Sequence, residues 1–456
     1  MRKSKDISIL TIYFLNIFLP FYAITRAFFQ FENINILSLF INYVRDAVIL
    51  TCLLICILKQ NLRNSDRYKF SNESKITKNV KIGILLLFVN YSYGFFVSII
   101  SGYFDLAIKG VHLNVVPIFL VYIIYSSNYI KVEAIRSFIR MSINIGMVVS
   151  IIGLYFYVIK PDIFGSLLLI FSQQESANYL QVLNYSRMVG TFLSPNVFGS
   201  YMAISLLITI NEIINTRENK LLFLNITATV TFLTCLILSL SRGAWAFAVV
   251  GIFILIISNK TKLNISKIKL LISIITVIMI AGLIISLLDG EVADYSFYRL
   301  ISLFDGSSSA YGRVDNWAQA IDSLSSNIFG FGLGVGGINL TYNTELAQSL
   351  GVQVVDGYYI KLVVETGIVG MFLFSMFLFL EIHSLLKAIK KYKSKNRDIY
   401  ILTLAIFGGF LAQSFGSNPL DYVNIAPFLW IYLGFSMKLL LTAEDKSENM
   451  EVNTSN

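Results

Sequence analysis

Charged residues are scarce in this chain. Asp, Glu, Lys and Arg make up 14% of its 456 residues, whereas ordinary soluble domains contain roughly 25%. This scarcity excludes a soluble fold. The apolar residues make up 56% of the sequence and fall into separate runs near twenty residues long. A run of that length crosses the roughly 30 Å hydrocarbon core of a bilayer as one helix, so the sequence predicts a polytopic membrane protein.

Cysteine and histidine are also rare. The three cysteines, Cys52, Cys56 and Cys235, all lie inside apolar runs, and the two histidines, His112 and His383, are far apart in the sequence. This distribution supports neither a disulfide framework nor a His/Cys metal site. We therefore expect no metal and no cofactor.

The apolar runs are expected to form transmembrane helices, because a helix satisfies its own backbone polar groups in lipid. We predict an all-α fold with a single transmembrane domain over residues 1–443 and a polar cytoplasmic tail over 444–456. The first run imitates a signal peptide, but it is too long for one and no cleavage site follows, so we interpret it as the first span. The twelve predicted spans are 7–29, 34–58, 82–101, 111–127, 141–158, 193–214, 221–240, 244–258, 270–288, 357–380, 399–417 and 425–441.

The net charge of +9 arises from short basic segments between the apolar runs. With twelve spans, all of these segments fall on one side of the membrane. The positive-inside rule then places that side, and both termini, in the cytoplasm. Because these charges report orientation, we expect no nucleic-acid partner. The basic segments are the N-terminus, 59–81, 128–140, 215–220, 259–269 and 385–398.

One connection on the opposite, outer side is far longer than the others. It covers about residues 289–356 and contains eight acidic residues against only Arg299 and Arg313. Connections of this length are usually functional, and net acidity argues against binding to an anionic membrane surface. A second outer connection, 159–192, is of moderate length and carries Arg187.

Arg187 precedes the start of the sixth span. Ser194 and Pro195 have the residue types of a helix N-cap and first helical position. The positive end of this helix would therefore lie at the outer face near a guanidinium, which suits a phosphate or diphosphate. A snorkelling interfacial arginine is an equal alternative.

Arg242 lies in the outer turn between the seventh and eighth spans, within Ser239-Leu-Ser-Arg-Gly-Ala-Trp245. The turn contains almost no polar loop that could keep the guanidinium solvated. An ionisable group held this close to hydrocarbon is a candidate functional residue. The alternative is simple anchoring at the interface, with Trp245 in an aromatic belt. We favour a functional role, because the count of predicted spans independently places both Arg242 and Arg187 at the outer face of the membrane.

Two motifs lie in the long outer connection. Arg313, Trp317, Ile321 and Leu324 share one face of a predicted amphipathic helix. Packing on the membrane surface is the main role expected for it, with a phosphate contact from Arg313 as the alternative. The second motif, 330–337, is rich in glycine, but no strand precedes it, so we interpret it as a turn that allows close backbone approach and not as a dinucleotide site.

The tenth span opens with Asp356-Gly-Tyr-Tyr359. Asp356 has two interpretations, as the N-cap of the helix or as a general base at the mouth of an outer cavity. Within the same span, Lys361 and Glu365 are spaced to neutralise one another.

Arg45 and Asp46 in the second span are adjacent in sequence and are predicted to point in different directions, buried against other helices.

Taken in order, these motifs resemble the superfamily of bacterial O-antigen ligases and Wzy-type O-antigen or capsular polysaccharide polymerases. The resemblance extends from about Arg187 to Leu380. It is carried by Gly190-Thr-Phe-x-x-Pro-Asn196, Leu240-Ser-Arg-Gly-Ala-Trp245, Gly312-Arg-x-x-x-Trp317 with the glycine turn, and Asp356-Gly-Tyr-Tyr359 followed by Glu365-Thr-Gly-Ile-Val-Gly370.

The resemblance implies a GT-C-type glycosyltransferase that acts outside the bacterial cytoplasmic membrane on undecaprenyl-diphosphate-linked glycans, without a nucleotide sugar or an obligatory metal. It further implies that Arg187 and Arg242 hold the diphosphate. Ligases of this superfamily have a histidine where this chain has Asp356-Gly357, and this departure favours a polymerase. A flippase and a chain-length regulator are the expected protein partners.

We therefore expect a polymerase that transfers a growing glycan of O-antigen, capsule or exopolysaccharide from undecaprenyl diphosphate onto a lipid-linked repeat unit. The catalytic residues expected are Asp356 as base and the two arginines that stabilise the leaving diphosphate. An O-antigen ligase, or a flippase for lipid-linked oligosaccharides, is the alternative; a transporter would show internal repeats and charge near the membrane midplane. The expected substrate-binding residues are Arg187, Arg242, Arg313, Asn196 and Tyr358.

Overall fold

The structure is a computed structural model, and it describes residues 6–62, 74–175, 187–216, 218–259, 317–318, 320–322, 327–337, 356–392 and 396–454. The described residues form helices and turns, and no β-strand occurs among them. Their helical elements are α1 (Ile7–Phe31), α2 (Asn35–Leu62), α3 (Lys75–Ile100), α4 (Phe104–Gly110), η1 (Val111–Val115), η2 (Val116–Ile118), α5 (Phe119–Ser126), α6 (Val132–Ile159), α7 (Asp162–Glu175), η3 (Gly190–Phe192), α9 (Pro195–Asn215), α10 (Asn219–Leu238), α11 (Arg242–Ser258), α16 (Tyr358–Lys391), α17 (Arg397–Gln413), η5 (Pro419–Asp421) and α18 (Ala426–Thr454).

These helices confirm the all-α, polytopic class. Nine helical segments within the described ranges are long and apolar enough to cross a membrane. Two shorter helices of 17 residues each, α11 and α17, also coincide with predicted spans. The predicted span 270–288 lies outside the described residues, so the number twelve stays a prediction.

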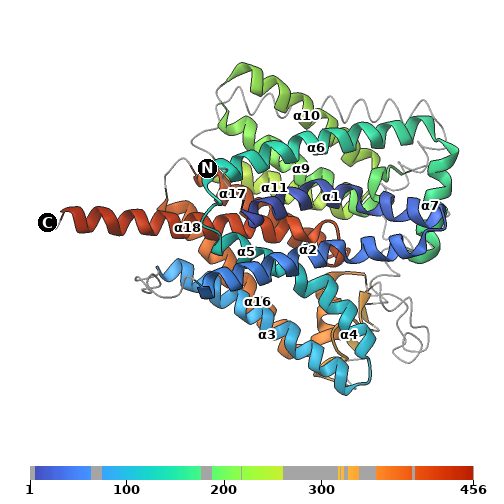
Figure 1. Cartoon of the computed structure of the whole chain (residues 1–456), viewed down its shortest axis with the longest axis horizontal. Coiled ribbons are helices and arrows are strands. Elements are labelled where there is room, and N and C mark those ends of the chain that lie inside the picture. Colours follow the sequence, from blue (N-terminus) through green and yellow to red (C-terminus); the bar gives the residue numbers. More distant parts are fainter. Residues whose placement is uncertain are drawn as a thin grey trace.

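The long helices run side by side, and α1 begins at the same end of the bundle at which α18 ends (Figure 1). At the other end, α7 packs with the second half of α1, the start of α2 and the chain before α9, through residues that include Tyr22, Phe164 and Leu193. We call this the site end. Helix α7 lies within 159–192, which was predicted only as an outer connection.

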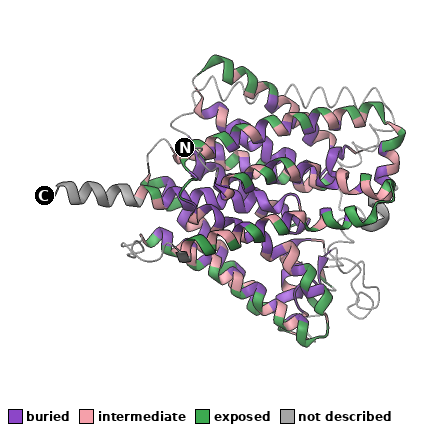
Figure 2. Cartoon of the chain, in the orientation of Figure 1, coloured by how far each residue is buried: buried purple, intermediate pink, exposed green. Residues whose placement is uncertain are grey.

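Burial differs strongly between the inner and outer helices (Figure 2). Almost every residue of α9 is buried, and so is most of α18 up to Ala443. By contrast, α2, α3 and α10 expose large apolar side chains such as Phe40, Leu85 and Phe223. Soluble proteins rarely expose apolar surface on this scale, so the distribution suits a bundle surrounded by lipid.

Helix α16 is broken at Gly367, whose φ of 60° and ψ of −158° are not helical. The segment 327–337, which we call the glycine turn, supplies the hydrogen bonds that the break removes. Phe331 N donates to Val364 O and Gly332 N to Glu365 O, each at 2.8 Å, and Ile368 N donates to Ile328 O at 3.2 Å. This exchange matters because lipid offers no partner for a freed backbone group.

The glycine turn fits between α3, α4 and α16 because glycines occupy its closest backbone contacts. A Cβ at Gly334 would lie 1.9 Å from Leu106 O, and one at Gly332 would lie 2.2 Å from Ser98 Oγ. Both glycines also have a positive φ, which residues with a Cβ rarely adopt. The prediction of a turn that allows close backbone approach is confirmed.

Candidate functional site

Two helices at the site end begin in the same way. Leu193 and Leu240 both adopt left-handed backbone conformations, which are strained for a branched side chain. Each is followed by a serine in extended conformation that forms the N-cap: Ser194 for α9 and Ser241 for α11. The predicted N-cap Ser194 and first helical residue Pro195 are thus confirmed.

The first turns of α9 and α11 touch. Ser241 Oγ donates to Asn196 Oδ1 at 3.1 Å, and Gly199 leaves room for Ser239 and Ala244 of the facing segment. Since the N-terminus of a helix carries unpaired N–H groups and a partial positive charge, two such ends side by side form a site suited to an anion.

Arg187 is bound to both of these helix starts. Its Nε donates to Ser239 O at 3.1 Å, and its Nη2 donates to Asn196 Oδ1 at 3.1 Å and to Leu240 O at 3.3 Å. The side chain is half-buried, and Asn196 is exposed. Arg242 is the first residue of α11 and is also half-buried. The structure therefore brings the Arg187 guanidinium to two adjoining helix N-termini, with Arg242 as the first residue of one of them.

A turn after α17 connects this place with the start of α16. Tyr358 N donates to Ser414 O at 2.8 Å and to Ser417 O at 3.2 Å. On its other side, the turn lies against α11, where a Cβ at Gly243 would be 3.2 Å from Gln413 Cγ and 3.6 Å from Ser417 Oγ. The turn thus contacts both the neighbour of Arg242 and the chain immediately after Asp356.

Asp356 is half-buried and lies two residues before the first residue of α16. Its main-chain oxygen accepts a hydrogen bond from Trp317 Nε1. The N-cap position of α16 is occupied by Gly357, with a φ of 112°, so the interpretation of Asp356 as the N-cap is wrong. A Cβ at position 357 would be 3.0 Å from Phe415 O, which explains why a glycine separates Asp356 from the helix.

Of the two remaining predicted binding residues, Tyr358 is described by the structure and Arg313 is not. The Tyr358 side chain is buried between helices, where its hydroxyl bonds to that of Tyr91 at 2.5 Å and to Asn114 Oδ1 at 3.4 Å. Arg313 lies outside the described residues. Part of its predicted amphipathic helix is described, and there Ala320 is buried while Ile321 is 51% exposed.

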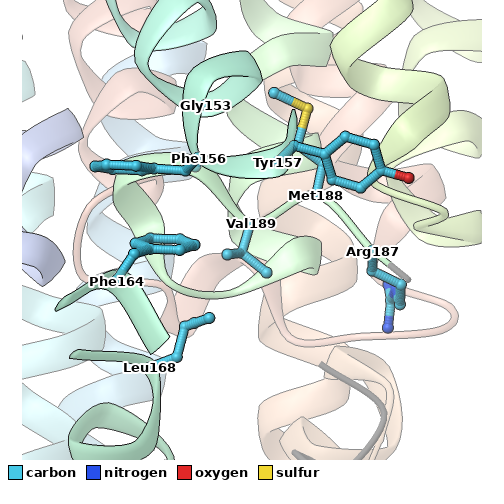
Figure 3. Close-up of a pocket in the computed structure, with 9 residues that line it drawn as sticks. Gly153, Phe156, Tyr157, Phe164, Leu168, Arg187, Met188 and Val189 are labelled. Atoms are coloured by element: carbon cyan, nitrogen blue, oxygen red, sulfur yellow. The ribbon is translucent and has the colours of Figure 1, made fainter. Parts of the chain in front are cut away.

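A small pocket lies next to Arg187, between the end of α6, α7 and residues 187–190. The rings of Phe156 and Phe164 stack in it with centroids 4.2 Å apart. Figure 3 shows these rings and Leu168 on one side of the pocket and Arg187 on the other. Because Phe164 and Leu168 are buried, the apolar lining of this pocket is largely covered by the protein itself.

Sequence reasoning missed the full extent of charge inside the bundle. Lys361 and Glu365 pair at 3.5 Å as predicted, but the shorter contact of Lys361 is to Asp421, at 2.6 Å. The sequence signal for this contact was Asp421 itself, an isolated aspartate in the otherwise uncharged stretch between α17 and α18.

Arg45 and Asp46 form a second buried charged group. The prediction that they point in different directions is wrong, because Arg45 Nε donates to Asp46 Oδ1 at 2.7 Å. His112, on the π-helical segment η1, bonds to both side chains. Burial of the pair against other helices is confirmed. In the described part of the chain, no three His, Cys, Asp or Glu side chains gather into a group that could hold a metal ion.

Comparison with known proteins agrees with the motifs. Residues 227–375 match a family described as O-antigen ligase. The O-antigen polymerase of Salmonella muenchen is 26% identical over 340 residues, which cover 70% of this chain and 81% of the Salmonella protein. The segment that matches the ligase family contains Arg242, the glycine turn and Asp356, while Arg187 precedes it. The resemblance to the O-antigen ligase and polymerase superfamily is confirmed.

Proposed function

We propose, from its similarity to O-antigen ligases and polymerases, that this chain is a membrane glycosyltransferase that polymerises lipid-linked oligosaccharide repeat units of O-antigen, capsule or exopolysaccharide. The observation that carries the proposal is the meeting of the α9 and α11 N-termini around Arg187 and Asn196, with Arg242 at the start of α11. The donor is a glycan on undecaprenyl diphosphate, and the acceptor is a lipid-linked repeat unit.

The two arginines and the helix N-termini bind the diphosphate of the donor. Diphosphate leaves as an anion, so charge stabilisation contributes more than protonation. A guanidinium donates in a planar fork that fits phosphate oxygens. Arg187 is already oriented by three hydrogen bonds, and a pre-oriented donor loses little freedom when the substrate arrives. Asn196, exposed on the first turn of α9, adds a polar contact beside the arginine.

Asp356 accepts the proton of the acceptor sugar hydroxyl. As the hydroxyl oxygen forms its bond to the anomeric carbon of the donor, the bond from that carbon to the diphosphate oxygen breaks, and the hydroxyl proton passes to the carboxylate. This single displacement inverts the anomeric carbon and needs no cofactor. Tyr358 helps to bind substrate indirectly, by fixing the chain after Asp356, and Arg313 contacts a substrate phosphate.

The site end faces away from the cytoplasm, and both termini are cytoplasmic. This orientation follows from the positive-inside rule, since the basic segments lie at the ends of the spans remote from Arg187 and Arg242. A flippase delivers the lipid-linked repeat unit, and a chain-length regulator limits the product.

The test is reconstitution. The purified chain in bilayer nanodiscs is incubated with lipid-linked repeat units isolated from host cells that lack it, and the products are separated on a gel. A ladder of increasing lengths supports polymerisation. Transfer of one glycan to a different acceptor supports the ligase function, which the matched family description favours, and movement of intact lipid-linked units without new glycosidic bonds supports a flippase.

A further inference from the structure

The connection between α17 and α18 is unusual because it is buried. Connections normally lie on the surface, where water satisfies their backbone. Here Ser417, Asn418, Asp421 and Asn424 are all buried. We call residues 417–425 the buried link. Irregular backbone in the interior of a membrane bundle requires partners from the protein itself.

Two buried cations hold the link. Lys361 Nζ donates to Asp421 Oδ1 at 2.6 Å, with the two side chains 2% and 3% exposed. Farther along, Arg45 Nη1 donates to Val423 O at 3.0 Å. The link is therefore fixed to α16 and to α2, from two sides of the bundle.

Lys361 also reaches the glycine turn, through Glu365. The two side chains pair at 3.5 Å, and Glu365 Oε1 accepts hydrogen bonds from Gly334 N and Gly336 N at 3.0 Å each. The glycine turn thus binds the Glu365 carboxylate through two main-chain N–H groups. One lysine connects this turn, α16 and the buried link.

The first residue of the link belongs to the candidate site. Ser417 accepts a hydrogen bond from Tyr358 N and lies against Gly243, the neighbour of Arg242. Lys361 is one helical turn beyond Tyr358, so its bond to Asp421 holds the link directly behind this contact. The position of Arg242 relative to Asp356 thus depends on the position of the link.

We infer that Lys361 and Asp421 are positioning residues, which set the spacing between the diphosphate-binding arginines and the base Asp356. This inference rests on the proposed function. A buried ion pair is often no more stable than apolar residues of the same volume. A short, directional hydrogen bond, however, allows one relative position, whereas apolar contacts tolerate small shifts. Displacement of a catalytic group by about 1 Å from its productive position is enough to reduce a reaction rate about 10²-fold.

The test compares two alanine variants. Asp421→Ala removes the anchor, and Asp398→Ala is the matched control, since Asp398 is a buried carboxylate that pairs with Arg136 at 2.8 Å at the other end of α17. We expect Asp421→Ala to reduce the transfer rate on isolated lipid-linked repeat units at least tenfold. Its affinity for undecaprenyl diphosphate should stay within twofold of the parent, because the bonds of Arg187 do not involve the link. Asp398→Ala should keep the parental rate per folded molecule.

A conservative variant separates positioning from catalysis. The amide oxygen of Asp421→Asn can still accept from Lys361, so this variant should recover at least a third of the parental rate. If Asp421→Asn is as slow as Asp421→Ala, the carboxylate acts chemically and the positioning role is overturned. Equal rates for Asp421→Ala and Asp398→Ala would also overturn it.

A third variant addresses folding. Lys361→Met combined with Glu365→Gln and Asp421→Leu removes the charges but keeps the volume and the acceptor for the glycine turn. We expect it to unfold at a temperature close to the parental one and still transfer at least tenfold more slowly. A parental rate in this variant, or failure of all Asp421 variants to fold while Asp398→Ala folds, would assign the cluster a purely structural role. If the parent itself makes no ladder, the proposed function has failed instead.

Discussion

Ser241, the N-cap of α11, donates a hydrogen bond from Oγ to Asn196 Oδ1 in the first turn of α9. The same amide oxygen accepts from Arg187 Nη2. One asparagine therefore connects two helix starts and one guanidinium that are separated by up to 54 positions in the chain. This relationship brings the Arg187 guanidinium and the N-termini of α9 and α11 together in the candidate site.

The first prediction concerns Arg187. Its three hydrogen bonds run to two main-chain oxygens and one amide, and the ammonium of a lysine cannot reproduce the planar fork. We expect Arg187→Ala and Arg187→Lys both to lower polymer formation, the alanine variant by ~10²–10³-fold, in the range found when a charge-stabilising donor is removed. Arg140→Ala, an exposed arginine of α6, is the control and should polymerise normally. Near-parental polymer from Arg187→Ala would remove this residue from the site.

The second prediction concerns Asp356. Because Gly357 and not Asp356 occupies the N-cap of α16, Asp356→Asn should leave the unfolding temperature unchanged. We expect the variant to bind undecaprenyl diphosphate like the parent and to transfer about 10²–10⁴-fold more slowly, the usual loss when a general base is removed. Single-turnover transfer rates measure this. Polymer synthesis at the parental rate would leave the arginines as the main chemical contribution.

The third prediction concerns the glycine turn. Gly334 and Gly102 have nearly the same φ, 84° and 82°, but a Cβ at Gly334 meets Leu106 O at 1.9 Å and one at Gly102 meets nothing within 4 Å. Gly102→Ala should therefore show only the left-handed penalty of roughly 1–2 kcal/mol. Gly334→Ala should show that penalty plus roughly 1–3 kcal/mol for overpacking. Thermal unfolding in detergent compares them, and equal losses would argue against tight insertion of the turn.

The fourth prediction concerns orientation. Asp162 at the start of α7 and Asn219 at the start of α10 are both exposed and lie at opposite ends of the bundle. In a background with the three native cysteines replaced by serine, a membrane-impermeant thiol reagent should label Asp162→Cys in spheroplasts. Asn219→Cys should react only after the membrane is opened. The reverse pattern would place the candidate site in the cytoplasm.

Local sequence patterns predicted the spans that fall within the described residues, because helix formation in lipid depends on the hydrophobicity of one continuous segment. The helix start at Ser194 was readable from the sequence for the same reason, since a cap involves only a few neighbouring residues, whereas the N-cap Ser241 was found only in the structure. The start of α16 was placed one residue from its true N-cap, because the close approach of Phe415 O to Gly357 comes from the turn after α17, far away in the sequence.

The sequence by itself determined the all-helical membrane class, the family resemblance and the residue types suited to diphosphate chemistry, all of which depend on composition and short motifs. Only the tertiary structure decided which of these residues meet. The bond from Lys361 to Asp421 joins positions 60 apart, and that from Arg45 to Val423 joins positions 378 apart. Such pairs form because each buried charge or freed backbone group must find a partner inside the bundle, and which partner lies within reach is set by how the helices pack.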